Sequence, residues 1–363
     1  MSENWVPEYK VKIDGKELPQ ADDLHLQQIT IDLRRQAPAS CEIQFNNHSG
    51  DYDQRDDLGP GTVIQVMLGY TQKAPEVVFE GEVIGTRVRT QENGPRVFVV
   101  RAYDALHKLT RGRKTRTFLD QKFSDIVQQV AGDWGLSPEV EDTKFVREYV
   151  IEHNQTDLDF VRGIAGWLDY DLHIRHREDP KKLRFKPPEV GAGGVLKAVY
   201  EKPDIPAGDV YLRRFDGRQS LARVVSEVVV RGWNPGEKRE IVGTATSGDL
   251  YGKMGGQSSA IDELVKQWGE TERQVVDYKV FSQDEADQIA KTKLNEYART
   301  FIKADIELQG DPRPHPGAVV DVSLVGPRYD GPYFIDRVIH TFLSPVGQQG
   351  GYTTRLQAAR CAW

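Results

Sequence analysis

Three closely spaced carboxylates, Glu139, Glu141 and Asp142, are the residues of this sequence that most resemble a hydrolytic site. Glycoside hydrolysis needs two carboxyl groups about 5–9.5 Å apart in a cleft. These three stand in a polar stretch after a helix-like pattern that ends at Gly135, which is typical of a solvated loop. The sequence therefore favours a chain without catalytic activity, and a peptidoglycan hydrolase is the less favoured alternative.

Two further groups of side chains could suggest a metal site. His173 and His176 are three residues apart, but on a strand such residues point to opposite faces, and no third ligand is nearby in the sequence. Asp53, Asp56 and Asp57 crowd an acidic loop that lacks the central glycine and distal glutamate of an EF-hand. We therefore expect no metal and no cofactor. We expect the three aspartates either at a contact between subunits or in water.

The one dense basic run contains Arg111, Arg113, Lys114 and Arg116. Because such side chains bind phosphates, the run could touch DNA. It could equally pair with acidic residues of a neighbouring chain or remain solvated. The whole chain has a net charge of -7, and this acidic balance argues against a protein whose main task is to grip nucleic acid.

Cysteines, glycines and the N-terminus add no chemistry. Neither Cys41 nor Cys361 has a cysteine or histidine at metal-ligand spacing, so we expect buried thiols. Gly191-Ala192-Gly193-Gly194 lacks the lysine and hydroxyl of a phosphate-binding loop. The start, Met1-Ser2-Glu3-Asn4-Trp5, lacks the regions of a signal peptide, and no apolar run approaches the roughly 18–20 residues that span a bilayer. We expect synthesis in the cytoplasm and no stable membrane insertion.

The elements that must position these residues are mainly β-strands. The chain has 363 residues, of which 38% are hydrophobic and 28% charged, as in a soluble globular protein of two or three domains. Short runs rich in branched residues recur between turn signals over residues 9–103, and Ile64, Val66 and Leu68 fall on one face of such a strand. Many short strands with tight turns predict a barrel or a sandwich.

Helices and a connector interrupt this β-structure. Apolar residues recur at helical spacing over residues 123–134, and capping boxes predict further helices that begin at Thr156 and Ser282. Residues 176–222 are rich in proline, glycine and charge, which indicates a connector or an irregular subdomain. Strands return from Val224.

Two segments far apart in the sequence resemble each other. Residues 60–68 and 316–324 share a Pro-Gly pair and alternating branched residues at an offset of 256. Residues 79–86 match residues 334–341 at an offset of 255. Any two hairpins can share a Pro-Gly turn and alternating valines, but the number of matches favours two copies of one β-module.

A duplicated module has a geometric consequence. Three copies of such a chain in a closed ring present six similar modules around one axis. That ring could dock on a six-fold tube at one end and on a three-fold spike at the other. Symmetry adaptation would then need no active site.

The order and spacing of several further stretches resemble one known family. They are Phe79-Glu80-Gly81-Glu82-Val83, Val99 to Leu106, Leu109-Thr110-Arg111-Gly112-Arg113, Tyr149 to Val161, Val228 to Pro235, Gly310 to Gly317, and Gly331-Pro332-Tyr333 with His340 and Gly351-Tyr352-Thr353-Thr354. In these stretches the chain resembles the phage late control protein D family. That family includes the hub proteins of contractile phage baseplates and the N-terminal hub part of VgrG-type spike proteins.

The resemblance implies a homotrimer with two tail-tube-like β-barrel modules per chain, which together form a pseudo-hexameric ring. The partners it implies are a tube or tube-initiator protein, a central spike, baseplate wedge proteins, and transiently DNA or effector cargo in the lumen. The sequence ends at Trp363 without an oligonucleotide-binding fold or a repetitive β-helix, so we expect the spike to be a separate protein. Phage, bacteriocin and secretion particles stay open.

We therefore predict an α+β, β-rich chain. A first tube-like β-barrel module covers residues 1–105, an α/β insert and connector covers 106–223, and a second tube-like module with an inserted helix covers 224–363. The predicted function is that of a structural baseplate hub in a virion or tail-like particle. The basic run and the acidic loop supply candidate interface or lumen residues. A β-rich surface adhesin or carbohydrate-binding module is the alternative, and the internal duplication argues against it.

Overall fold

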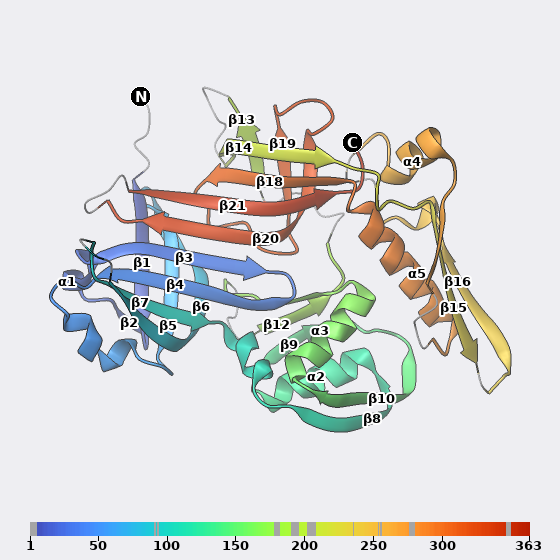
Figure 1. Ribbon diagram of the computed structural model, residues 1–363, viewed down its shortest axis with the longest axis horizontal. Coiled ribbons are helices and arrows are strands. Elements are labelled where there is room, and N and C mark those ends of the chain that lie inside the picture. The colour runs from blue at the N-terminus through green and yellow to red at the C-terminus, as the bar shows by residue number, and fades with distance from the viewer. Residues whose placement is uncertain are drawn as a thin grey trace.

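The computed structural model describes residues 6–363 except 91, 93, 178–181, 190–195, 202–207, 235, 253, 255, 276–279 and 346–349. The Gly191-Ala192-Gly193-Gly194 stretch therefore lies outside the described residues. Figure 1 shows a broad β-structure built from the blue N-terminal and red C-terminal strands, a green insert below it, and orange helices at one side. No helix in the described part is long and apolar enough to cross a membrane.

The N-terminal module is an antiparallel sheet of six main strands. These are β1 (Pro7–Ile13), β3 (Leu26–Arg34), β4 (Ala37–Asn46), β5 (Val63–Tyr70), β6 (Lys73–Arg89) and β7 (Val97–Tyr103). They lie in the order β1-β5-β6-β7-β4-β3. The connections contain β2 (Lys16–Glu17), α1 (Gln20–Asp23) and two 3-10 turns, Asp51–Gln54 and Asp56–Leu58. The outer strands β1 and β3 do not pair with each other, so this module is an open barrel.

Alternating side chains explain why this sheet has a core on one side. Ile64, Val66 and Leu68 are almost completely buried, whereas Val63 is 39% exposed. Successive residues of a strand point to opposite faces, so one face collects the apolar residues. Phe45 and Phe79 are fully buried in the same cluster. The alternation that the sequence predicts for this strand is therefore confirmed.

The C-terminal module is a closed barrel of six strands. These are β13 (Leu196–Tyr200), β14 (Val210–Gln219), β18 (Ile302–Gln309), β19 (Val319–Ser323), β20 (Gly331–Leu343) and β21 (Gly351–Arg360). They follow the order β13-β19-β20-β21-β18-β14, and β13 pairs with β14 to close the ring. β13 runs parallel to both of its neighbours. Two of these strands thus come from before residue 224, where the sequence suggested that the second module begins.

The two modules have the same strand order when their strands are matched along the sequence. β1, β3, β4, β5, β6 and β7 correspond in turn to β13, β14, β18, β19, β20 and β21. The Pro-Gly turns also match, because the N–H of Gly61 donates to the carbonyl of Val83 and the N–H of Gly317 donates to that of Ile335. Both glycines have a positive φ, 96° and 84°. The β-bulges match as well, after Val83 in β6 and after Ile335 in β20. The β-rich prediction with two barrel-like modules is confirmed.

The sequence match between residues 79–86 and residues 334–341 needs a correction. The ladders and bulges align Val83 with Ile335, an offset of 252, whereas the sequence match used 255. The connection between the Pro-Gly turn and the second strand is thus four residues shorter in the C-terminal copy, not one. Alternating apolar residues look alike at several registers, and only the hydrogen bonds fix which one is used.

A seam of backbone hydrogen bonds joins the two modules into one sheet. The second half of β20 pairs antiparallel with β3, from Arg337 opposite Arg34 to Leu343 opposite Gln28. Because β3 and β20 are strands of different modules, the sheet continues without interruption from one module into the other, as Figure 1 shows for β18, β21, β20, β3 and β4. We call this pairing the seam.

The insert has a hydrophobic core of its own. It contains a 3-10 turn (Ala105–Thr110), β8 (Lys114–Lys122), α2 (Phe123–Asp133), β9 (Ser137–Val140), β10 (Val146–Gln155), α3 (Asp157–Leu168), β11 (Asp171–Ile174) and β12 (Lys182–Lys186). The apolar faces of α2 and α3 are buried in this core, through residues such as Ile126, Val130 and Ile164. Thr156 accepts a hydrogen bond from the N–H of Asp159, so the predicted cap of α3 is present.

A small separate sheet of three strands stands beside the C-terminal barrel. It consists of β15 (Glu227–Asn234), β16 (Arg239–Ala245) and β17 (Glu272–Val275). A 3-10 turn (Ser247–Asp249), α4 (Ala260–Trp268) and α5 (Gln283–Ala298) accompany it, and α5 packs on β15 and β16. Ser282 caps α5 by accepting from the N–H of Glu285, as the sequence predicts.

Candidate functional site

The outer face of the continuous sheet carries a belt of polar side chains that crosses the seam. This polar belt consists of side chains that pair with one another across β18, β21, β20, β3, β4 and β7. Its residues are Asp305, Glu307, Arg355, Gln357, Arg337, Asp32, Glu42 and Arg101. These side chains alternate with buried ones, so they project on the side of the sheet opposite the core. A shallow hollow lies over the β14, β18, β20 and β21 part of the belt.

Cross-strand pairs neutralise most charges of the polar belt. The Nε of Arg337 donates to Asp32 at 2.8 Å across the seam itself. Arg355 donates to Glu307 at 2.9 Å within the C-terminal module, and Arg101 donates to Glu42 at 3.0 Å within the N-terminal one. Such half-exposed pairs stabilise a fold by only about 0–1 kcal/mol each. Their result is a hydrated surface of alternating sign rather than a strongly basic or acidic groove.

Asp32 marks the place where both modules meet in this belt. Burial opposes its ionisation, but hydrogen bonds from Arg337 and Arg34 outweigh that effect and lower the pKa of Asp32. The carboxylate is therefore ionised at neutral pH and binds one arginine from each side of the seam.

Next to the end of the seam lies a buried ion network that ties the insert to both modules. Arg35, in the turn between β3 and β4, donates to Asp171 at 2.5 Å and to Asp169 at 2.9 Å. Arg299, after α5, donates to the other oxygen of Asp169 at 2.6 Å. The ring of Phe334 in β20 lies under both guanidinium groups, 5.1 and 5.6 Å from them. Burial opposes the charge of Asp169, yet Arg299 and Arg35 outweigh it and lower its pKa.

The predicted basic run lies at the edge of the insert, and the structure divides it. Arg116 donates to Glu152, Asp133 and Asp157, each at 2.6 Å, so it is a structural residue of the insert. Lys114 likewise donates to Asp157 at 2.6 Å.

Arg111 and Arg113, the other half of the run, stay exposed. Arg113 donates to a backbone carbonyl, that of Asn154, and a nitrogen of Arg111 lies 3.4 Å from the ring of His107. Among the four basic residues, these two are the ones available to a partner.

The predicted acidic loop is at the far end of the N-terminal module, in the two 3-10 turns before β5. Asp57 binds Arg55 at 2.6 Å, and Arg55 also reaches Asp22 at 3.0 Å. Asp53 pairs with Arg96 and accepts a hydrogen bond from Asn47 at 2.6 Å. Asp53 and Asp57 are thus internally paired, whereas Asp56 is exposed at the surface.

The predicted histidine pair and carboxylate cluster form no metal site in the described part of the chain. No group of three or more His, Cys, Asp or Glu is arranged there to hold a metal ion. Lys186 pairs with Glu139 and lowers its pKa, and Lys122 binds Asp142 at 3.0 Å and lowers its pKa. A general acid of a glycosidase needs the opposite shift. Cys41 and Cys361 are both buried free thiols.

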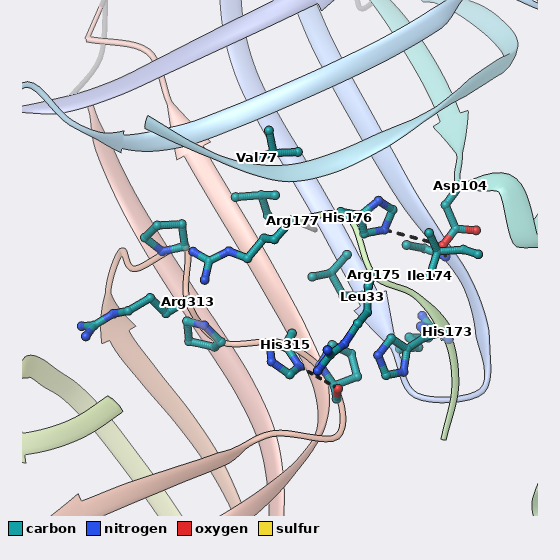
Figure 2. Close-up of a pocket in the computed structure, with 16 residues that line it drawn as sticks. Leu33, Val77, Asp104, His173, Ile174, Arg175, His176, Arg177, Arg313 and His315 are labelled. Atoms are coloured by element: carbon teal, nitrogen blue, oxygen red, sulfur yellow. Dashed lines mark hydrogen bonds and ion pairs between the residues drawn. The ribbon is translucent and has the colours of Figure 1, made fainter. Parts of the chain in front are cut away.

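Sequence reasoning missed a cavity of about 310 Å³ between the N-terminal module, the end of β11 and the 312–316 loop. Figure 2 shows His173, His176 and His315 around it, with Arg175 beside His315. The Nε2 of His176 lies 3.7 Å from Asp104. Burial raises the pKa of Asp104 to about 7 and lowers the pKa of His176 to about 4, so neither side chain carries a full, stable charge.

The comparisons with known proteins agree with this architecture. A family model described as the Alg8 N-terminal domain matches residues 3–343. The chain belongs to this family. Among curated proteins no match is found. The narrower assignment to the late control protein D family stays a prediction.

Several solved structures share the fold at low sequence identity. The tail protein from Neisseria meningitidis MC58 has a TM-score of 0.69 at 15% identity, with 98% of this chain and 97% of that chain covered. The 43 kDa tail protein of prophage MuSo2 from Shewanella oneidensis has a TM-score of 0.67 at 14% identity, with 98% of both chains covered. The E. coli c3393 protein, a component of the type VI secretion system, has a TM-score of 0.59 at 13% identity, with 97% of this chain and 77% of that chain covered. At these identities the likeness establishes the shared fold.

Proposed function

We propose that this chain is a structural subunit of the baseplate hub in a contractile tail or a tail-like injection particle, and that it has no catalytic role. Three copies form a ring of six β-modules, which adapts the six-fold tail tube to a three-fold central spike. The division of the chain follows the same idea, with one module at each end and the insert between them. We place β13 and β14 with the C-terminal module rather than with the insert.

One observation carries the proposal: the two modules have the same order of six strands, and the seam joins them side by side. A chain that repeats a module laterally through paired strands can continue that repetition around an axis, and closed rings are the common outcome of such contacts. The fold shared with tail proteins and with a type VI secretion component supports the same assignment.

The proposed partners follow from the ring. A tube or tube-initiator protein lies above it, a separate spike below it and wedge proteins outside it, and the polar belt faces the lumen. A belt of alternating charge lets DNA or protein cargo pass without binding tightly, because strong binding to phosphates needs uncompensated cations. We assign the exposed Arg111 and Arg113 and the acidic Asp53, Asp56 and Asp57 to contacts with neighbouring subunits. Lys114 and Arg116 support those contacts from within the insert.

Mass photometry of the purified chain, alone and with the tube and spike proteins, tests this function. We expect trimers, and class averages in negative stain with six similar densities around a channel. A chain that stays monomeric with both partners present contradicts the proposal. Zymography on purified peptidoglycan and a glycan array test the enzyme and adhesin alternatives in parallel, and we expect neither clearing nor glycan binding.

A further inference from the structure

Two different strands pair with the same edge of β20, the edge opposite β21. Its first residues, Gly331 to Phe334, pair with β19, and its second half pairs with β3 across the seam. The equivalent strand β6 begins in the same way, because its first part pairs with β5 up to Glu82. Residues 85–89 of β6 pair with β7 on one side only, and no described strand occupies their other edge.

The partner strand of the seam has an unpaired equivalent too. β3 pairs with β4 on one side and with β20 on the other. Its counterpart β14 pairs with β18 on one side, but β13 covers its other edge only over Val210–Leu212. In the described part of the chain, residues 214–219 therefore present free backbone groups along that edge. One chain thus holds one complete seam and the two separate halves of another.

The exposure of equivalent side chains differs between the paired strand β20 and the unpaired part of β6. His340 in β20 is completely buried at the seam, whereas the equivalent Val88 in β6 is 43% exposed. An apolar side chain left exposed next to unpaired backbone groups is unusual for the edge of a finished sheet, which proteins protect or cover.

We propose that β6 of one copy pairs antiparallel with β14 of the next copy and so repeats the seam between chains. This inference rests on the proposed ring and names the strands that close it. The ladders fix its register. Each β20 residue corresponds to the β6 residue 252 positions earlier, and each β3 residue to the β14 residue 186 positions later. The pair Thr341–Thr30 of the seam therefore becomes Arg89 opposite Asp216 of the next copy.

One pair of charges fits this register, because Arg89 comes to lie opposite Asp216. The next pair on the same face, Arg87 opposite Arg218, is like-charged. β6 brings Arg87 and Arg89 on one face, and β14 brings Asp216 between Arg214 and Arg218. Asp216 and Arg214 lie 3.7 Å apart and are both largely exposed, so the carboxylate is available to a closer partner. Opposite charges directly across an antiparallel pair stabilise it. Arg89 in turn makes a long hydrogen bond to Gln44, at 3.3 Å.

Disulfide trapping between copies tests the register. In an antiparallel pair the Cα atoms of opposite residues lie about 4.5–5.5 Å apart, which is within the range that a disulfide bridges. We expect the full-length double variant Arg89→Cys/Asp216→Cys, oxidised mildly, to give species of two and three times the chain mass on a non-reducing gel. Cys41 and Cys361 are buried, so the native chain should give none.

The matched control is Arg89→Cys/Gln219→Cys. Residue 219 is about 10 Å further along the strand and on its opposite face, so trapping should be lost. Equal trapping of both pairs, or a trimer by mass photometry that neither pair traps, overturns the β6–β14 contact and leaves the proposed hub intact. A native chain that stays monomeric even with tube and spike proteins overturns both.

Discussion

The N-terminal and C-terminal modules share one strand order but differ in how they end. The C-terminal barrel is closed by the parallel strand β13, whereas the N-terminal module runs its equivalent strand β1 antiparallel to β5 and leaves β1 and β3 apart. The open side is where β3 turns away to form the seam. The difference shows that a duplicated module keeps its central ladders, while its outer strands change to serve the contacts that each copy makes.

The two modules also differ at one matched position of their equivalent strands β20 and β6. The C-terminal copy places Phe334 under Arg35 and Arg299, next to the insert. The N-terminal copy has Glu82 at the equivalent position, where it pairs with Lys108 near the surface. The network that organises the three parts of the chain therefore depends on the C-terminal copy.

The largest expected effect comes from this position. Phe334→Ala removes a fully buried ring and the packing surface of two guanidinium groups, and we expect a loss of about 3–5 kcal/mol in unfolding free energy. The matched variant Glu82→Ala removes a half-exposed ion pair and should cost under about 1 kcal/mol. Urea unfolding followed by tryptophan fluorescence measures both, and similar losses would show that the two modules are energetically equivalent here.

Acid should destabilise the chain in part through a buried histidine of the C-terminal copy. Burial, aided by the nearby Arg177, lowers the pKa of His340 to about 3, while Val88 replaces it in the N-terminal copy. Because the unfolded chain protonates this histidine near pH 6.5 and the folded chain does not, the unfolded state binds more protons below that pH. His340 should therefore lower stability by about 1.4 kcal/mol per pH unit as the pH falls from about 6.5.

The variant His340→Gln tests this slope. Glutamine can still bond to the hydroxyl groups of Tyr352 and Thr354, which lie 3.0 and 3.2 Å from the histidine Nδ1. Between pH 7 and pH 5, the midpoint temperature of thermal unfolding should fall less steeply for the variant than for the native chain. Parallel curves would mean that His340 does not titrate on unfolding.

The two Pro-Gly turns should tolerate alanine unequally. Both Gly61 and Gly317 have a positive φ, so each Gly→Ala change should cost about 1–2 kcal/mol. A Cβ on Gly61 meets nothing within 4 Å, but one on Gly317 lies 2.6 Å from an oxygen of Asp171, which Arg35 holds in place. Gly317→Ala should therefore lose more stability in urea unfolding than Gly61→Ala. Equal losses would mean that Asp171 moves aside freely.

The smallest effect is expected in the polar belt. Glu42 and Arg101 occupy positions equivalent to Asp305 and Gln357, so an ion pair in one module replaces an amide–carboxylate hydrogen bond in the other. Arg101→Ala should cost at most about 1 kcal/mol and lose that effect at high salt. Gln357→Ala should show no salt dependence, and a salt-sensitive Gln357→Ala would contradict the assignment of the ion pair at this position to the N-terminal module alone.

Much of this architecture could be predicted from the sequence because its signals are local. Alternating residues such as Ile64, Val66 and Leu68 identify a strand, and the caps at Thr156 and Ser282 identify helix starts, without knowledge of the rest of the chain. The Pro-Gly repeat was visible for the same reason. The register of β20 was not, since an apolar alternation fits several alignments and only the ladder with β19 decides between them.

The seam and the buried network could not be read from the sequence because they join residues far apart in the chain. Asp32 and Arg337 are separated by 305 positions, and each looks like an ordinary polar residue on the outer face of a strand. Asp171 gives at most a weak signal, as an acidic residue at the start of a short strand that is buried throughout. The sequence also could not show that Lys114 and Arg116, two of the four members of the basic run, neutralise acids within the insert.

The seven-residue seam also has a mechanical consequence. A load applied along the strands stretches all of its hydrogen bonds together, so they share the force and fail only together. A load applied across the strands would instead open them one after another. A particle that drives its parts along the strand direction would therefore meet the stiff response of this joint, and dismantling from the side would meet the compliant one.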